Sequence, residues 1–182
     1  GVPLPKTVWL PKGSSIELLT LFNNNGWQKA VVKPAISATA YQTFLITLED
    51  AGYHQVAFNT LLHENDLIVQ QFIPQVQQKG EWSLIFFNKK FSHAVLKKPK
   101  ASDFRVQNDF GGTACAVEPS LRLVNQAKKI LALICEPLLY ARIDGVEVDD
   151  QFLLMELELI EPVLFLSLSK EGVTRFAENL LL

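Results

Sequence analysis

The chain has 182 residues, of which 48% are hydrophobic and 20% are charged, as in an ordinary folded domain. Its 17 lysines and arginines nearly balance its 19 aspartates and glutamates, so the net charge is −2. This balance excludes a disordered chain and leaves no basic surplus for a phosphate backbone, so nucleic acid is not an expected partner. The longest apolar runs are far shorter than the roughly 20 residues that span a bilayer, so a membrane is not expected either.

The cysteines and histidines form no recognisable site. Cys115 and Cys135 belong to no CxxC pair and lie beside no histidine cluster, which argues against a zinc site or a disulfide framework. The histidines His54, His63 and His93 fit no Ser/His/Asp or Cys/His pattern, so no protein nucleophile is expected. The expected location is the reducing cytoplasm.

Short strands alternating with helices are predicted up to Pro74. The prolines Pro11, Pro34 and Pro74 each follow an apolar run and end it. We expect strands over residues 7–10, 30–33, 43–48 and 66–72, and helices over about 14–22 and 51–62. The first helix would be capped by Ser14 or Ser15 and would end at the asparagine–glycine turn of residues 23–26.

The pattern of residues in the second half of the sequence predicts a meander of strands, a long helix, a hairpin and a C-terminal helix. The expected meander strands cover 82–87, 91–96 and 104–106. Pro119 would open a helix that runs to about Cys135, with one apolar stripe formed by Leu121, Val124, Ala127, Leu131 and Ile134. Strands over about 139–146 and 152–159 would turn at Asp149 and Asp150, and a helix over 170–182 would close the chain.

The hairpin carries a group of carboxylates on one predicted face. A two-residue period puts Arg142 and Asp144 on one side of the first strand, and Glu156 and Glu158 on one side of the second. If the chain turns near residue 150, Asp144 lies opposite Glu156. Carboxylates this close repel unless a cation lies among them, and oxygen ligands suit Mg²⁺. A polar face that is simply solvated explains the same alternation, and that alternative stays open.

A second candidate feature is the lysine at the end of an apolar strand. Lys33 directly precedes Pro34, and a charge in this position either reaches to solvent or faces an anion. The residues that follow lack the glycine-rich motif of a P-loop, but Ser37 and Thr39 can line phosphate oxygens.

The order of these features resembles the ATP-grasp superfamily, in particular glutathione synthetase and RimK-type carboxylate–amine ligases and the cyclo-ligases of cycloserine biosynthesis. Residues 31–34 resemble the strand that carries the family's phosphate-binding lysine, here Lys33. Residues 68–74 resemble the hinge whose backbone reads adenine, which implies contacts from Gln70, Gln71, Phe72 and Ile73. Glu81 takes the place of the acidic residue that holds the ribose.

The remaining matches concern phosphoryl transfer and metal binding. Arg105, followed by two glycines at 111–112, is similar to the family's arginine and double-glycine segment. Asp144 and the Glu156-Leu157-Glu158 triplet match the metal-binding aspartate and Glu-x-Asn pair. The resemblance thus implies that Asp144, Glu156 and Glu158 hold the metal, and that Lys33, Arg105 and Arg142 act on the transferring phosphate.

The resemblance implies an α+β ATP-grasp fold in which two α+β lobes with antiparallel sheets clasp a nucleotide. The small lobe would cover about residues 1–70 and the large lobe about 71–182, and a substrate domain would precede Gly1. The implied cofactors are ATP and Mg²⁺, with Mn²⁺ as the alternative ion. The implied reaction moves the γ-phosphate to a small-molecule carboxylate, and an amine or thiol then attacks the acyl phosphate. A homo-oligomer is left open.

Some positions depart from the family pattern. Glu158 replaces a commoner Asn, Gln71 replaces a common Glu, Gln107 replaces an Asn, and the phosphate loop has no glycine. A degenerate nucleotide-binding or scaffold module without turnover is therefore the main alternative. An α+β interaction domain with merely solvated carboxylates is the third.

Overall fold

The computed structural model describes residues 1–37, 41–100, 105–106 and 111–181, which form two compact units. The smaller unit is Pro5–Ile73, and the larger contains Gly1–Leu4 and the residues from Pro74 onward. The first four residues, placed in the small lobe by the sequence analysis, thus pack with the larger unit. There Val2 packs against the hydrophobic core, and the amide of Leu154 donates to the Pro3 carbonyl at 3.0 Å.

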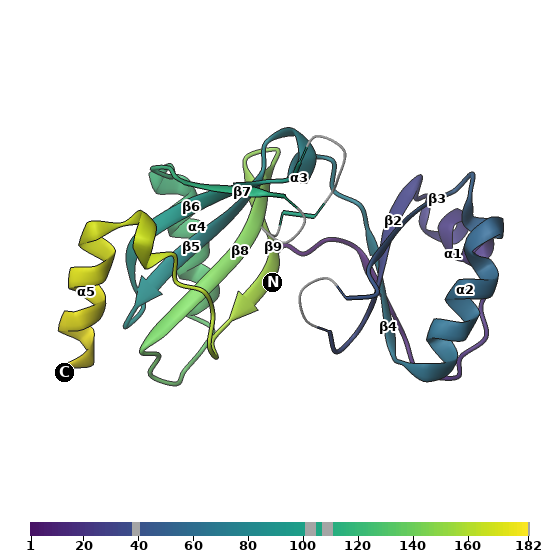
Figure 1. Cartoon of the computed structure of the whole chain (residues 1–182), viewed down its shortest axis with the longest axis horizontal. Coiled ribbons are helices and arrows are strands. Elements are labelled where there is room, and N and C mark those ends of the chain that lie inside the picture. The colour runs from purple at the N-terminus through teal and green to yellow at the C-terminus, as the bar shows by residue number, and fades with distance from the viewer. Residues whose placement is uncertain (38–40, 101–104, 107–110, 182) are drawn as a thin grey trace. The chain divides into compact units, whose positions relative to one another are not determined.

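The smaller unit is an antiparallel sheet with helices on one face (Figure 1). Its strand order is β1-β4-β2-β3, with β1 at Thr7–Leu10, β2 at Lys29–Pro34, β3 at Phe44–Thr47 and β4 at Leu67–Gln71. Helices α1 (Leu18–Asn25) and α2 (Ala51–Glu64) bury Phe22 and Leu62 against Val32 and Val69 of the central strands. The alternate residues of β2, among them Lys33, therefore point away from this core.

Helix α1 begins later than the sequence predicts. The hydroxyl of Ser14 donates to the Pro11 carbonyl instead of capping a helix, and Glu17 is still extended, so the first helical residue is Leu18. The expected end is present, because Gly26 has a positive φ of 66° and stops the helix after Asn25.

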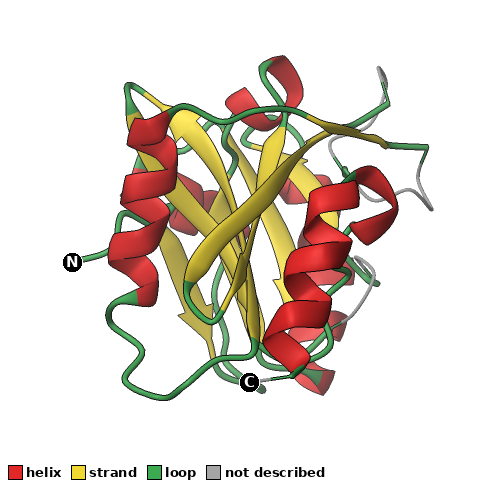
Figure 2. Cartoon of the chain, turned by 90° about the vertical axis from the view of Figure 1, so that its left-hand side faces the viewer, coloured by secondary structure: helices red, strands yellow, loops and turns green. Residues whose placement is uncertain are grey.

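The larger unit is a five-stranded antiparallel sheet between two helices (Figure 2). The strand order is β7-β6-β5-β8-β9, with β5 at Glu81–Phe87, β6 at Lys90–Lys98, β7 at Thr113–Ala116, β8 at Tyr140–Val148 and β9 at Gln151–Glu158. The other elements are α3 (Gln75–Gln78), α4 (Leu121–Leu131), the 3₁₀ turn η2 (Leu166–Leu168) and α5 (Lys170–Leu180). Among the described residues, no helix is long and apolar enough to cross a membrane.

The two faces of this sheet have different compositions. On one face Leu84, Phe86 and Ile143 pack against Leu123 and Ala127 of α4. The other face carries the alternate residues of β5, which are Glu81, Ser83, Ile85 and Phe87. Phe87 contacts Phe176 of α5 with 5.2 Å between ring centroids, so α5 covers one end of the second face. The polar residues lie at the other end.

Three sequence expectations for the larger unit are wrong in detail. Helix α4 ends at Leu131 rather than near Cys135, because the amides of Leu133 and Ile134 bond three residues back and tighten the chain into a turn. Leu121 is 82% exposed, so it lies outside the buried stripe. Helix α4 also begins at Leu121 rather than at Pro119, because Ser120 is its N-cap: the Ser120 hydroxyl accepts a hydrogen bond from the Leu123 amide.

The third meander strand also lies elsewhere. Phe104 falls outside the described residues, and Arg105 and Val106 are not in a strand. The strand that pairs with β6 is β7, which the sequence analysis did not predict. The hydroxyl- and cysteine-containing run of residues 113–116 alternates too weakly in polarity to reveal it.

Both hairpins of this sheet contain a β-bulge. The turns are two residues long and left-handed, at Asn88–Lys89 and at Asp149–Asp150. The register of β5 with β6 shifts between Ile85 and Phe86, which leaves Ser92 as the extra residue. The register of β8 with β9 shifts beside Asp144 and leaves Met155 as the extra residue. Each bulge moves every later side chain of the pair by one position.

We expect Gly145→Ala to destabilise the larger unit by about 1–3 kcal/mol, because the added methyl group overpacks the sheet. A Cβ at Gly145 would lie 2.4 Å from Cζ of Phe152 and 2.6 Å from the Leu153 carbonyl oxygen. Urea-induced unfolding measures the change. Gly52→Ala is the control, because nothing lies within 4 Å of its Cβ position and alanine favours the helix, so stability should be kept or rise by up to about 1 kcal/mol. Equal stability of the two variants would contradict the prediction.

Candidate functional site

Three carboxylates come together on the sheet face opposite α4. Asp144 of β8 pairs with Glu156 of β9, as the sequence predicts, and Arg142 pairs with Glu158 two residues along. One oxygen from each of Asp144, Glu156 and Glu158 lies within 4.8 Å of the others. Asp144 is 0% exposed, Glu158 is half-buried and Glu156 is exposed. The cluster therefore has one end inside the protein and one end in solvent.

Arg142 links two of these carboxylates. Its Nε donates to Oδ1 and Oδ2 of Asp144 at 3.0 and 3.2 Å, and its Nη2 donates to Oε1 of Glu158. Burial alone lowers the pKa of Arg142, but the charges of Asp144 and Glu158 outweigh this and hold the pKa above its ordinary value. Arg142 is thus a fixed cation beside the cluster.

Lys97, which the sequence analysis did not select, is the second cation of the site. Its Nζ lies 2.5 Å from Oε1 of Glu81 and 2.7 Å from Oδ2 of Asp144. Burial disfavours the charged amine, but the two carboxylates more than compensate, so the pKa of Lys97 is raised. Lys97 therefore joins the predicted ribose-binding carboxylate, Glu81, to the predicted metal-binding one, Asp144.

The acidic residues that surround these cations are hard to ionise together. The pKa of Glu81 is raised to about 7, mainly because the residue is buried and also because Asp144 and Glu156 are negative, while Lys97 opposes the shift. The pKa of Glu158 is raised as well, by burial and by Asp144, against the effect of Arg142. Each raised pKa means that a further positive charge would be favourable here.

The chemistry of the donor set fits a hard divalent cation. Four carboxylates, from Glu81, Asp144, Glu156 and Glu158, face two basic side chains, so the fully ionised group has two unbalanced negative charges. All of the ligand atoms are oxygens, which is the preference of Mg²⁺ and Mn²⁺. Asp144, Glu156 and Glu158 are the residues that could hold such an ion.

Lys33 lies on the smaller unit. It is half-buried on β2, pairs with Ile68 of β4 and points to the side of the sheet away from α1 and α2. Gln70 pairs with Val31 on the same side, and its Nε2 donates to Thr7 Oγ1 at 3.2 Å. The lysine and the predicted hinge strand thus share one face of this unit.

The hinge backbone is less available than the sequence suggests. The family resemblance implies that the backbone of residues 70–73 contacts adenine, but two of its amides are already paired: the Gln71 amide donates to the Lys6 carbonyl at 2.8 Å, and the Phe72 amide donates to the Lys29 carbonyl at 3.1 Å. Among the described residues, no hydrogen bond involves the Ile73 amide or the Phe72 carbonyl. These two groups are therefore available to the edge of a base.

Of the other predicted residues, the structure describes Ser37 and Arg105. Ser37 is exposed, and its hydroxyl donates to the Tyr41 carbonyl at 2.9 Å. Thr39 and Gln107 lie outside the described residues. Arg105 is half-buried beside the buried Val106, between two segments that also lie outside them.

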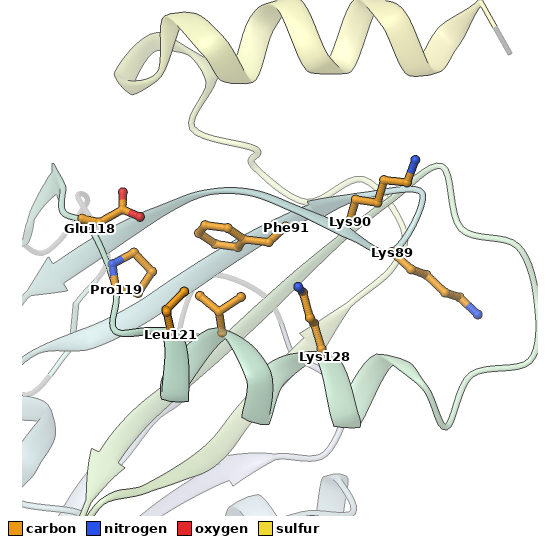
Figure 3. Close-up of a pocket in the computed structure, with 8 residues that line it drawn as sticks. Lys89, Lys90, Phe91, Glu118, Pro119, Leu121 and Lys128 are labelled. Carbon is orange, nitrogen blue, oxygen red and sulfur yellow. The ribbon is translucent and has the colours of Figure 1, made fainter.

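A hollow of about 550 Å³ lies on the α4 side of the larger unit. Lys90, Phe91, Pro119 and Lys128 border it, and Figure 3 shows the side chains of the strand and the helix on its two sides. It contains none of the predicted site residues, so it is separate from the carboxylate cluster.

We expect Lys97→Met to destabilise the protein by about 3 kcal/mol near pH 8, because the change leaves Glu81 and Asp144 with less neutralising charge in a buried place. Chemical denaturation measures the loss. Lys98→Met is the matched control, because Lys98 is exposed on the next position of β6 and the effect should stay within about 0.5 kcal/mol. Similar losses in both variants would contradict a role for the buried ion pairs.

Glu81 should make stability fall as the pH rises. Its pKa is about 7 in the folded protein against 4.5 for the ordinary group, so the folded state binds the proton more tightly. This stabilisation is complete below pH 4.5 and is lost towards pH 7, by up to about 3 kcal/mol. Glu81→Gln should remove this component, so the variant should gain stability relative to the native chain between pH 4.5 and 8 in urea titrations. Glu178→Gln, at an exposed position, is the control. A stability difference that does not vary with pH would refute the assignment.

Comparison with known proteins identifies relatives of this fold. No protein-family model matches the chain. It is 30% identical over 196 aligned positions to the cycloserine biosynthesis protein DcsG of Streptomyces lavendulae, an alignment that covers 99% of the chain and 64% of DcsG. The crystal structure of D-cycloserine synthetase DcsG superposes with a TM-score of 0.82 at 26% identity, over 98% of this chain and 64% of that one.

More distant structures share the fold. D-alanine–D-alanine ligase from Bacillus anthracis has a TM-score of 0.68 at 18% identity, over 97% of this chain and 58% of that one. The ATP-grasp ligase PsnB, complexed with minimal precursor, Mg and ADP, has a TM-score of 0.67 at 13% identity, over 98% of this chain and 54% of that one. The chain thus spans 64% of the length of the curated relative that it matches. In sequence and fold, the chain is therefore similar to D-cycloserine synthetase DcsG, and its fold is shared by the ATP-grasp ligase PsnB.

Proposed function

We propose that the chain is the ATP-binding part of an ATP- and Mg²⁺-dependent ligase that joins a carboxylate to an amine or a thiol through an acyl phosphate. The relatives support this proposal by name: DcsG is a D-cycloserine synthetase, the Bacillus anthracis protein is a D-alanine–D-alanine ligase, and PsnB is an ATP-grasp ligase. We take the reaction of glutathione synthetase and RimK-type carboxylate–amine ligases as the model for the reaction of this protein.

The observation that carries the proposal is the buried position of Asp144 among two cations and two further candidate metal ligands. A merely solvated hairpin face would leave Asp144 in water, but this side chain has no exposed surface. Its oxygens lie against Lys97 and Arg142, while Glu156 and Glu158 extend the acidic group toward solvent. A binding site for a metal–nucleotide complex explains this arrangement better than a solvated polar surface does.

Each unit is proposed to supply part of the nucleotide-binding set. In the smaller unit, Lys33 would neutralise phosphate charge, and the Ile73 amide and Phe72 carbonyl would pair with adenine. In the larger unit, Glu81 would accept hydrogen bonds from the ribose and is kept in place by Lys97. Arg105 is assigned to the phosphate on the family resemblance alone.

Asp144, Glu156 and Glu158 are the residues that would hold Mg²⁺. The ion, when bound, supplies charge neutralisation of the phosphates. Arg142 would stabilise the negative charge on the phosphoryl group as it moves from ATP to the substrate carboxylate, with ADP as the leaving group. The amine or thiol would then form a bond to the acyl carbon as inorganic phosphate leaves, so the protein need not provide a nucleophile.

The substrates are proposed to be a small carboxylate and a small amine or thiol, in line with the names of DcsG and the D-alanine ligase. Cys115 and Cys135 are both free and exposed, which fits the cytoplasmic location that we propose. The competing function is a nucleotide-binding module without turnover, favoured by Gln71 at a position where relatives commonly carry Glu.

We expect Glu156→Gln to weaken binding of an ATP analogue at least tenfold in the presence of Mg²⁺, and to have little effect without it, because one charged metal ligand is lost. Isothermal titration calorimetry with a non-hydrolysable ATP analogue measures both affinities. Glu147→Gln, on the neighbouring strand outside the cluster, is the matched control. Equal affinity of native protein and Glu156→Gln at saturating Mg²⁺ would contradict the metal assignment.

Turnover is tested on the complete protein with a panel of amino acids and amines, by measuring ADP release. Release that depends on one carboxylate and one amine or thiol would support the ligase. Mg²⁺-dependent nucleotide binding without release for any pair in a broad panel would favour the module without turnover.

A further inference from the structure

The connection between β9 and α5 passes over the second face of the larger sheet, beside the carboxylate cluster. We call residues 161–165 of this connection the strap. Its contacts reach two different strands, because Val163 bonds to a side chain of β8 and Leu164 bonds to a side chain of β6. In Figure 1 the same connection runs in front of the sheet on its way to α5.

The sheet register explains how a short segment can reach both strands. Ile85 of β5 pairs with His93 on one side and with Arg142 on the other, so these three side chains share a face and lie in one line across the sheet. The Val163 carbonyl accepts from Nη1 of Arg142 at 3.2 Å, and the next carbonyl, that of Leu164, lies 2.9 Å from Nε2 of His93. Two successive carbonyls of the strap thus bond to side chains on the two sides of β5.

Phe165 supplies a second contact to the arginine. Cζ of Arg142 lies 5.8 Å from the centroid of the Phe165 ring, within the range of a cation–π interaction. The backbone of Phe165 has a φ of 51°, a conformation that a bulky side chain rarely adopts. An aromatic residue held in this conformation indicates that the position of its ring is a constraint on the segment.

The His93 ring is held in place by its neighbours and donates a hydrogen bond to the strap. Its Nδ1 lies 2.9 Å from the Ser92 hydroxyl, and since a carbonyl can only accept, its Nε2 carries the hydrogen toward Leu164. Gly172 of α5 packs on the ring so closely that a Cβ there would lie 2.7 Å from two ring atoms. Burial lowers the pKa of His93, the charge of Arg175 adds to this effect and the bond to Leu164 opposes it.

The contacts of Arg142 fall into two groups: those that a bound cation would weaken and those that it would leave unchanged. Its bonds to Asp144 and Glu158 involve the same carboxylates that would hold the cation, so an ion would compete with the guanidinium for them. The Val163 carbonyl and the Phe165 ring are neutral and take no part in the cluster. Among the contacts that the described residues make to Arg142, those of the strap are therefore the ones that can hold the guanidinium with unchanged strength when the carboxylates are occupied.

We propose that the strap fixes the guanidinium of Arg142 beside the carboxylate cluster, and that Phe165 and His93 are positioning residues for it. Phe165 acts through its ring, and His93 acts through the Leu164 carbonyl. This inference deepens the proposed function and rests on it, since the role of Arg142 in phosphoryl transfer belongs to that proposal.

The first test needs no ligand and no turnover. In the complete protein, exchange of the Arg142 Nη1 hydrogens with water is followed by NMR, because Nη1 is the nitrogen that donates to the Val163 carbonyl; the signal is assigned by its loss in Arg142→Lys. We expect exchange to become at least about tenfold faster in Phe165→Leu and in His93→Leu, because the guanidinium loses its cover. Phe165→Tyr should keep the native rate, and so should His93→Gln, which retains a side-chain donor. Ile160→Ala is the matched control, because Ile160 precedes the strap and is 83% exposed.

The second test separates positioning from general stability. We expect Phe165→Leu to lower Mg²⁺- and ATP-dependent ADP release about 10- to 100-fold, as a misplaced catalytic group does, while the affinity for a non-hydrolysable ATP analogue changes less than about threefold. Phe165→Tyr should restore the rate. A loss of rate that only parallels a loss of nucleotide affinity would overturn the proposal.

The two tests distinguish failure of this inference from failure of the proposed function. Native protein that binds no Mg²⁺–nucleotide would refute the proposed function, and the exchange measurement would then decide the inference by itself. Unchanged exchange in both Phe165→Leu and His93→Leu would show that the strap does not hold Arg142, whatever the enzyme does.

Discussion

The larger unit depends on the ion pairs of Asp144. A carboxylate without exposed surface is tolerated only where opposite charge and hydrogen bonds replace water, and here Lys97 and Arg142 do so from β6 and β8. Lys97 must reach across β5 to make its contact. Ser83, which pairs with Asp144 on the intervening strand, is small enough to leave that path open. The same contact draws in Glu81, so one buried carboxylate organises polar residues from three adjacent strands.

The two β-bulges decide which residues meet in this group. In a regular hairpin turning at Asn88–Lys89, Glu81 would pair with Leu96, and Lys97 would point to the α4 side. The extra Ser92 shifts the pairing so that Glu81 meets Lys97. In the second hairpin the extra Met155 has the same effect and brings Glu156, rather than Met155, opposite Asp144. The site thus requires two local irregularities of a sheet that is otherwise regular.

This requirement explains what could be predicted from the sequence. The apolar periods, the prolines and the turn residues predict most strands and helices. The sequence also predicts that Asp144 lies opposite Glu156, from a turn near residue 150, but the structure reaches this pairing through a two-residue turn at Asp149–Asp150 together with the bulge at Met155. Lys97 could not be found in this way, because a bulge has no signature in the pattern of polar and apolar residues. The engaged amides of Gln71 and Phe72 were missed for a related reason: their acceptors, Lys6 and Lys29, are distant in sequence and have nothing in their side chains that marks a paired carbonyl. The end of α4 depends on its last turn, where propensity is weak.

Because of the order of residues along β5, the carboxylate cluster has a buried apolar side and a solvent-exposed side. Glu81, Ser83, Ile85 and Phe87 follow each other on the same face, so acid is succeeded by hydroxyl, aliphatic and aromatic groups. Ile85 and Phe87 are buried, and Phe87 lies against α5. Water is excluded on that side, which strengthens the interactions of Arg142 and Asp144 by lowering the local dielectric constant. Glu156 is exposed on the other side. A cation or a charged ligand would therefore reach Asp144 from the Glu156 side, while the apolar side keeps the arginine and the buried carboxylate from exchanging their partners for water.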